Sequence, residues 1–168
     1  MLLDTNAHSV FLLNYHLILV AKYRKEVFDT AVSSRAKEIF ERIAPNYKID
    51  CIEWNHDKDH IHVLFKAHPK SEISKFINAY KSASSRLLKK EFPAIKQKLW
   101  KDMFWSQSFC LITTGGAPLE VIKQYIVSQG QKWASKSLKP INTGSIQALS
   151  SKSSLLSRLV VLALFGIK

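Results

Sequence analysis

The side chains with the clearest chemical potential fall in two motifs that are well separated along the chain. The motif at 59–62 reads Asp-His-Ile-His and opens an apolar run, while Tyr125 and Gln129 lie further on, in a stretch with helical periodicity. Side chains of a strand alternate between its two faces, so His60 and His62 should share one face. Residues four apart on a helix also share a face, which places Tyr125 beside Gln129.

If the two faces meet, His60, His62 and Gln129 would form a half-open metal site. Two imidazoles and an amide oxygen would leave positions free for water and for a phosphate oxygen, an arrangement that suits Lewis-acid catalysis on phosphate. Mixed nitrogen and oxygen ligands are compatible with Mg²⁺ or Mn²⁺, and imidazoles also suit Zn²⁺. Asp59 could fix the tautomer of one imidazole by accepting a hydrogen bond from it.

Tyr125 is the candidate nucleophile. A phenol, with a pKa of roughly 10, is mostly protonated at neutral pH and needs activation. A basic neighbour such as Lys123, or polarisation of the attacked phosphate by a metal, would provide it. A metal site beside a phenol is what breakage of a phosphodiester through a covalent protein–nucleic acid link requires.

Each of these signals also has a purely structural interpretation. A His-x-His pair on a strand is more often surface or core histidine than a ligand set, and a tyrosine on an amphipathic helix usually only packs. His56 and His68 lie close to the pair in sequence, so a structural Zn²⁺ site is a further alternative.

Length and charge limit the possible classes of protein. A chain of 168 residues makes one domain, or one domain with a tail, and can bury a proper core. The formal net charge is +12, and no Asp or Glu follows Glu120. Such a balance points first to nucleic acid and second to an acidic membrane surface, with simple solubility as the alternative.

The sequence favours a cytoplasmic protein without a membrane span. Cys51 and Cys110 form no CxxC pair, and we interpret them as reduced, half-buried strand residues. The N-terminus lacks the basic and apolar regions of a signal peptide. The longest apolar run, at 159–167, is too short to cross a bilayer.

Hydrophobic periodicity predicts an alternation of strands and helices. Strands are expected at 10–23, 47–54, 60–66 and 104–113, and helices at 30–43, 71–91 and 118 to about 136. This order predicts an α+β fold of the ferredoxin-like split βαβ type, an antiparallel sheet with helices on one face. The other face would hold the histidine pair, and the additional C-terminal helix that carries Tyr125 would cover it.

We place the domain at 1–139 and treat 140–168 as a tail of unknown role. Within that tail, residues 142–154 are rich in Ser, Thr, Gly and Gln and are typical of a linker, while 155–167 could form an apolar or amphipathic helix.

Taken together, the motifs resemble the small single-tyrosine transposases of the HUH superfamily, the IS200-like family encoded by compact bacterial and archaeal insertion sequences. The resemblance covers about residues 11 to 133. Its motifs occur in the family's order and spacing: Tyr15-His16-Leu17 leading to Lys22-Tyr23-Arg24, Asp59-His60-Ile61-His62, Trp105-Ser106 through Thr114-Gly115-Gly116, and Tyr125 with Gln129.

The resemblance implies a mechanism that the residues alone do not. It implies a homodimer that acts on single-stranded DNA with hairpin ends and forms a 5′-phosphotyrosine at Tyr125. It also implies that His60, His62 and Gln129 are the metal ligands, and that the tyrosine helix commonly serves the partner subunit's histidine pair. The glycines of Thr114-Gly115-Gly116 would be the hinge that lets this helix move.

Two other functions fit the same fold. A non-catalytic regulator could bind nucleic-acid hairpins through phosphate contacts, but such a relative should have lost a catalytic residue, and all four are present here. An HUH nuclease of replication initiation or plasmid transfer is less consistent with a chain this short.

Overall fold

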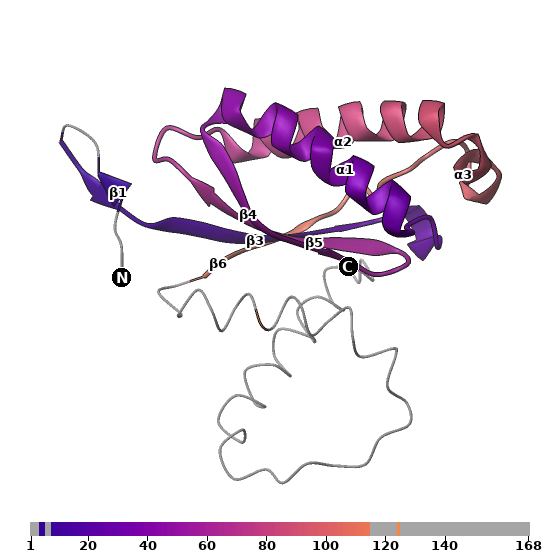
Figure 1. Ribbon diagram of the computed structural model, residues 1–168, viewed down its shortest axis with the longest axis horizontal. Coiled ribbons are helices and arrows are strands. Elements are labelled where there is room, and N and C mark those ends of the chain that lie inside the picture. The colour runs from indigo at the N-terminus through magenta and orange to yellow at the C-terminus, as the bar shows by residue number, and fades with distance from the viewer. Residues whose placement is uncertain (1–3, 6–7, 115–123, 125–168) are drawn as a thin grey trace, which may run out of the picture.

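The computed structural model describes residues 4–5, 8–114 and 124. Its centre is an antiparallel four-stranded sheet with two helices packed on one face (Figure 1). This architecture confirms the predicted α+β fold with helices on one side of an antiparallel sheet. In the order in which they pair, the strands are β4 (Ile49–His56), β5 (His60–Ala67), β3 (Leu13–Val20) and β6 (Cys110–Thr113), and the helices are α1 (Thr30–Ile43) and α2 (Ile73–Glu91).

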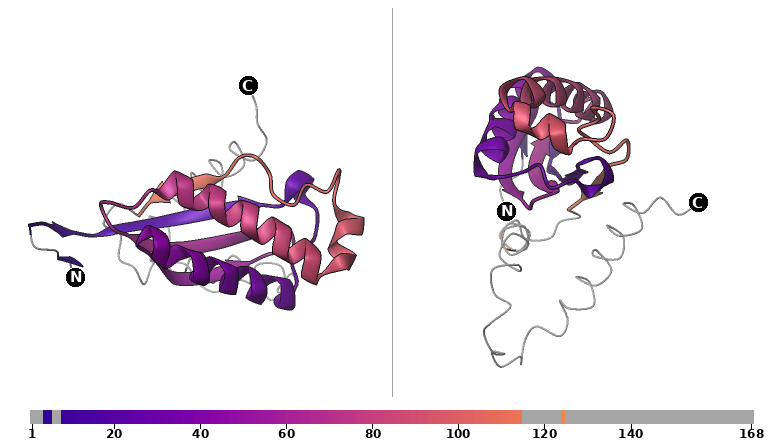
Figure 2. Two further views of the ribbon diagram at one scale, coloured as in Figure 1. Left: turned by 90° about the horizontal axis from the view of Figure 1, so that it is seen from above. Right: turned by 90° about the vertical axis from the view of Figure 1, so that its right-hand side faces the viewer.

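Smaller elements complete the described part of the chain. A hairpin of two very short strands precedes β3, one 3₁₀ turn follows β3 and another follows α1, and a short helix follows α2 (Figure 2). These elements are β1 (Asp4–Thr5), β2 (Val10–Phe11), η1 (Lys22–Arg24), η2 (Ala44–Tyr47) and α3 (Pro93–Lys98).

The sequence predicted the positions of most of these elements closely, but two of the predicted strands are longer than the observed ones. Helix α1 has the expected bounds, and Asp29 caps it by accepting a hydrogen bond from the Val32 amide at 2.8 Å. The strand predicted at 10–23 ends at Val20, because η1 then turns the backbone away from the sheet. The strand predicted at 104–113 is reduced to β6 and an isolated bridge between Ala21 and Trp105. Helix α3 was not predicted.

The predicted helix at 118–136 lies outside the described residues, except for Gln124, which is helical. The tail at 140–168 lies outside them as well. Within the part of the chain that the structure describes, no helix is long and apolar enough to cross a membrane. Cys51 and Cys110 are free, half-buried residues of β4 and β6, as predicted.

The pairing of β3 with β5 separates a core face from a histidine face. Leu17 lies opposite Val63, and these residues belong to the core beneath α1 and α2. Ile18 lies opposite His62, and both must face the other way because side chains alternate along a strand. The residues of the core face are Leu17, Leu19, Ile61, Val63 and Phe65, while His16, Ile18, Val20, His60 and His62 share the histidine face.

A β-bulge changes the alternation in the edge strand β4. Cys51 pairs with Phe65 and Glu53 pairs with Leu64, so Ile52 is an extra residue on this strand. Because of it, both Cys51 and Trp54 pack against the core, although one has an odd and the other an even number. Trp54 also donates its indole N–H to Ser33 Oγ of α1 at 3.0 Å.

Buried hydrogen bonds tie the segment after α3 to α2. The indole N–H of Trp105 donates to Ser84 Oγ at 2.9 Å, and the Ser84 hydroxyl donates to the carbonyl of Tyr80 at 2.6 Å. Ser84 has no exposed surface. It therefore accepts the hydrogen bond of a buried donor and fixes the chain beside the bridge between Trp105 and Ala21.

Ser84→Ala should lower the free energy of unfolding by about 1–3 kcal/mol, because it leaves the buried Trp105 N–H without an acceptor. Chemical denaturation would measure the change. Ser82→Ala is the matched control, since Ser82 is exposed on the same helix. If both variants lose the same small amount of unfolding free energy, the hydrogen bond between Trp105 and Ser84 does not stabilise the fold.

Candidate active site

The histidine motif begins at the tight turn between β4 and β5. The Asp57 amide donates to the His60 carbonyl at 2.9 Å, which closes the turn. The Ala21 amide donates to the Asp59 carbonyl at 2.8 Å, so the turn is also fixed to the end of β3. The motif therefore has a defined backbone on both sides before any side-chain contact is considered.

His60 and His62 point their Nε2 atoms at each other. These two atoms lie 3.1 Å apart on the face of the sheet opposite the helices, as the alternation predicted. His62 is buried and His60 is half-buried. The expectation that the two imidazoles share one face is confirmed.

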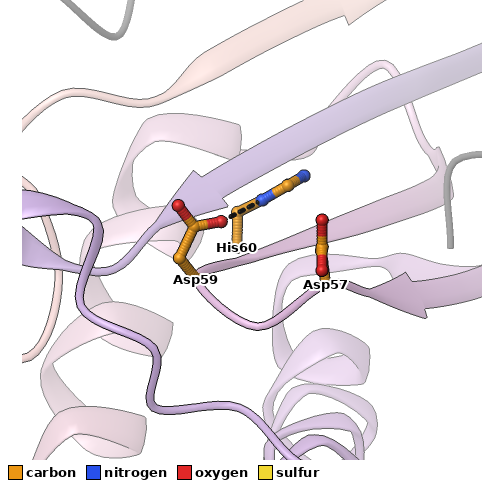
Figure 3. Close-up of side chains that lie close together, drawn as sticks. All are labelled: Asp57, Asp59 and His60. Atoms are coloured by element: carbon orange, nitrogen blue, oxygen red, sulfur yellow. Dashed lines mark hydrogen bonds and ion pairs between the residues drawn. The ribbon is translucent and has the colours of Figure 1, made fainter. Parts of the chain in front are cut away.

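Asp59 holds the imidazole of His60 in place. Its Oδ1 lies 2.6 Å from His60 Nδ1, the contact drawn in Figure 3. Its Oδ2 accepts a hydrogen bond from Arg24 Nε at 2.5 Å. Burial alone would raise the pKa of Asp59, but the hydrogen bonds from His60 and Arg24 outweigh it and the pKa is lowered. Asp59 is thus an anion placed to accept Nδ1–H of His60, and the Nε2 atom of that ring then faces His62.

His16 holds the second imidazole. Its Nε2 lies 3.0 Å from Nδ1 of His62, and the two rings are stacked with centroids 5.2 Å apart. His16 is opposite Leu64 in the strand pairing, so it reaches His62 diagonally across two strands. Burial lowers the pKa of His16 to about 4, and burial followed by the proximity of His16 and His60 lowers the pKa of His62 well below its usual value. Both rings are therefore neutral at pH 7.

The donor set fits a divalent cation. In the tautomers that donate Nδ1–H of His60 to Asp59 and Nδ1–H of His62 to His16, both Nε2 lone pairs face the same small space. Two lone pairs 3.1 Å apart repel each other unless a proton or a cation lies between them. A pair of neutral imidazoles, each with its other nitrogen hydrogen-bonded, is the usual form of protein metal ligands.

A second group of potential ligands is present but is already occupied by protein contacts. Asp57, Asp59 and His60 have ligand atoms within 4.8 Å of one another (Figure 3). Both carboxylate oxygens of Asp59 are engaged, however, one by His60 and the other by Arg24. A cation there would compete with the guanidinium, so we favour the Nε2 side of the pair.

The structural zinc alternative is not supported in the region that the structure describes. Neither His56 nor His68 joins a group of three potential ligands there. Nδ1 of His68 instead accepts a hydrogen bond from the Lys70 amide at 3.1 Å, and its ring lies against Phe11.

The other predicted site residues, Tyr125 and Gln129, lie outside the described residues, as do Gly115 and Gly116 of the predicted hinge. The last described residue before Gly115 is Thr114, whose amide donates to the Asn14 carbonyl at 3.0 Å.

The sequence interpretation gave no chemical role to His16 or Arg24, although both fall in motifs quoted for the resemblance. Alternation along the first long strand could have placed His16 on the histidine face of a strand that pairs with β5. No comparable signal exists for Arg24, because its contact with Asp59 depends on the left-handed backbone of η1, with φ of 53° at Arg24 itself.

Comparison with known proteins agrees with this geometry. Residues 9–129 match the family model described as "Transposase IS200 like". The chain is 36% identical over 123 residues to the ISDra2 transposase TnpA of Deinococcus radiodurans, which covers 73% of this chain and 88% of that protein.

Two solved structures are similar. A crystal structure of a transposase from Deinococcus radiodurans R1 superposes with a TM-score of 0.61 at 32% identity, covering 75% of this chain and 97% of the other. A REP-associated tyrosine transposase bound to a REP hairpin has a TM-score of 0.51 at 9% identity, covering 84% and 91%, and this likeness concerns the fold alone.

Acid should destabilise the fold through His16. In the folded protein the pKa of His16 is about 4, whereas an unfolded histidine titrates near 6.5, so between these values the unfolded state binds more protons. The stabilisation is complete above pH 6.5 and is lost as the pH falls toward 4. His16→Gln should flatten this fall by up to about 1.4 kcal/mol per pH unit.

Denaturant titrations in the presence of a chelator, repeated across this pH range, would measure the slope. His8→Gln, at an exposed position, is the control. Parallel pH profiles for wild type and His16→Gln would contradict the assignment.

Proposed function

This chain belongs to the IS200-like transposase family, and from that premise we propose that it cleaves and rejoins single-stranded DNA through a covalent bond between Tyr125 and a 5′-phosphate. The observation that carries the proposal is the pair of Nε2 atoms 3.1 Å apart, each on an imidazole whose Nδ1 has its own partner. This arrangement directs one nitrogen of each imidazole at the same small space, as a shared cation requires.

We propose that His60, His62 and the amide oxygen of Gln129 hold Mg²⁺ or Mn²⁺. A bound cation would polarise a non-bridging oxygen of the scissile phosphate and stabilise the charge that develops there. The part of this chain is to orient both imidazoles, which Asp59 and His16 do through the two Nδ1 atoms.

The proposed reaction exchanges one phosphodiester for another. Oη of Tyr125 attacks the phosphorus, the bond from phosphorus to the 3′ oxygen breaks, and the phenol proton is lost while the departing oxygen becomes a 3′-hydroxyl. The aryl phosphodiester keeps the energy of the broken bond, so a 3′-hydroxyl can reverse the step without ATP. No oxidation or reduction is involved.

The proposed substrate is single-stranded DNA that carries hairpins at the ends of the element. The REP-associated relative was solved with a hairpin, and the net charge of +12 suits a polyanion. We further propose a homodimer in which the helix that carries Tyr125 serves the partner subunit's histidine pair. A hairpin-binding regulator on the same fold is the alternative, and it would bind such DNA without forming a covalent product.

Tyr125→Phe should abolish covalent adduct formation and leave hairpin binding nearly intact, because only the attacking oxygen is removed. The assay is incubation with labelled single-stranded DNA carrying candidate hairpin ends and Mg²⁺ or Mn²⁺, followed by a denaturing gel. An undiminished adduct in Tyr125→Phe would refute the nucleophile. Native-gel complexes without any adduct from wild type, across several ends and both metals, would favour the regulator.

His16→Leu should weaken Mn²⁺ binding by roughly 10- to 100-fold, because the acceptor that fixes the His62 tautomer is lost. His16→Gln should retain most of the affinity, since a glutamine oxygen can accept the same N–H. Titration followed by Mn²⁺ electron paramagnetic resonance measures the affinity directly and needs no DNA. Equal affinities for Leu, Gln and wild type would mean that His16 only packs against the site.

A further inference from the structure

An exposed aromatic cluster lies just beyond the end of β3. Four large hydrophobic side chains are exposed in the described part of the chain, and three of them, Tyr23, Trp100 and Met103, belong to two neighbouring segments. The rings of Tyr23 and Trp100 meet edge to face with centroids 5.1 Å apart, although Tyr23 is 60% and Trp100 is 42% exposed. Large rings exposed in this way contribute little to the core, and a shared patch of them commonly marks a binding surface.

Cations accompany both rings. The ammonium of Lys22 lies 4.9 Å from the centroid of Tyr23, and that of Lys101 lies 4.6 Å from the centroid of Trp100. A surface that combines aromatic faces with lysines is suited to nucleic acid, because bases stack on the rings and phosphates pair with the ammonium groups. A protein partner would be better served by an apolar centre from which charge is excluded.

The backbone beneath the cluster adopts unfavourable conformations. Five non-glycine residues of the described chain have positive φ, and four of them are Tyr23, Arg24, Lys101 and Asp102, with φ between 47° and 58°. Each such residue costs about 1–3 kcal/mol and persists where the surrounding structure imposes it, typically at functional surfaces. The two strained segments are those that present Tyr23 and Trp100.

The cluster lies at the histidine end of the sheet. Val20, three residues before Tyr23, pairs with His60, and Arg24 binds Asp59, which in turn holds His60. The segment after β3 and helix α3 lie at the same end of the molecule in Figure 1 and in the left view of Figure 2. Lys98 of α3 connects them, because its Nζ donates to the Glu26 carbonyl at 3.0 Å. A strand stacked on the cluster would therefore lie at the end of the sheet where β5 begins with His60.

A basic groove adjoins the cluster. It has a volume of about 720 Å³ and reaches Asp102, the residue between Lys101 and Met103. The Lys89 ammonium binds the Asp102 carboxylate at 2.6 Å, which offsets the acidic charge at this point. The cationic residues that line the groove are Lys81, Arg86, Lys89, Lys90 and Lys96.

We propose that Tyr23 and Trp100 form a stacking platform for an unpaired base of single-stranded DNA, with Lys22 and Lys101 contacting the adjoining phosphates. The proposal rests on the proposed function, because it assigns this platform to the strand that approaches the histidine pair. It concerns binding only and involves no group that reacts. The platform would tolerate any base, since every base has a face that can stack.

The test is binding of labelled oligothymidylate by the full chain in the presence of a chelator, which prevents cleavage, with fluorescence anisotropy as the readout. Tyr23→Leu and Trp100→Leu should each raise Kd by about tenfold or more, as expected for the loss of one stacked base. Trp100→Phe keeps a ring and should bind nearly as wild type does. A blunt hairpin without unpaired nucleotides should be affected much less by either leucine variant.

Intrinsic fluorescence provides an independent signature. A base stacked on the exposed Trp100 should quench its emission, so the quenching seen with wild type should be lost in Trp100→Phe although that variant still binds. Val10→Ala is the matched control, because Val10 is also an exposed hydrophobic residue (61%) but lies in β2 at the other end of β3. Thermal melting of each variant separates lost binding from lost folding.

Unchanged oligothymidylate Kd in both folded leucine variants would overturn the platform. So would leucine variants that become monomeric in sedimentation while binding DNA normally, because the rings would then be a contact between copies of the chain. The covalent adduct assay reports separately on the proposed function. If the folded leucine variants form the adduct and bind with the wild-type Kd, the proposed function holds and the platform is refuted. If the leucine variants bind more weakly but wild type forms no adduct, the platform holds and the proposed function is refuted.

Discussion

The register in which β3 pairs with β5 is the constraint on which the site depends. With Ile18 opposite His62 and Leu17 opposite Val63, one set of side chains fills the core and the other set builds the histidine face. A slip of one residue would bring the histidines under α1 and α2 and expose the core residues, at a cost in burial that no polar contact could offset. The hydrophobic core therefore specifies, by exclusion, where the imidazoles lie, and the polar contacts only adjust their orientation.

Asp59 joins three parts of the molecule through three different atoms. Its carbonyl receives the Ala21 amide, one carboxylate oxygen receives His60, and the other receives Arg24. The end of β3, the first residue of β5 and the left-handed turn η1 therefore move as one unit. Since Tyr23 belongs to the same turn, its backbone is tied to the imidazole pair through Asp59, which a ring on a flexible loop would lack.

The fold and half of the site could be predicted from the sequence because they depend on periodicity. Strand alternation gave the shared face of His60 and His62, and the helical spacing at 30–43 gave α1 with its actual bounds. Contacts between distant segments have no periodic signal, so the support of His62 by His16 and of Asp59 by Arg24 was not assigned. Long strands were predicted at 10–23 and 104–113 because buried aromatic residues such as Phe104 resemble strand residues even where they pack outside the sheet.

The bulge at Ile52 has a consequence for how related chains can differ in length. Before it, the odd-numbered residues of β4 face the core, and after it the even-numbered ones do, with Trp54 under α1 and Asn55 opposite His62. A chain without this extra residue could not keep both Cys51 and Trp54 packed against the core while β4 stays paired with β5. Related chains should therefore differ by coupled substitutions in the two halves of β4. Deletion of one residue from this strand should be tolerated only when the packing of α1 changes with it.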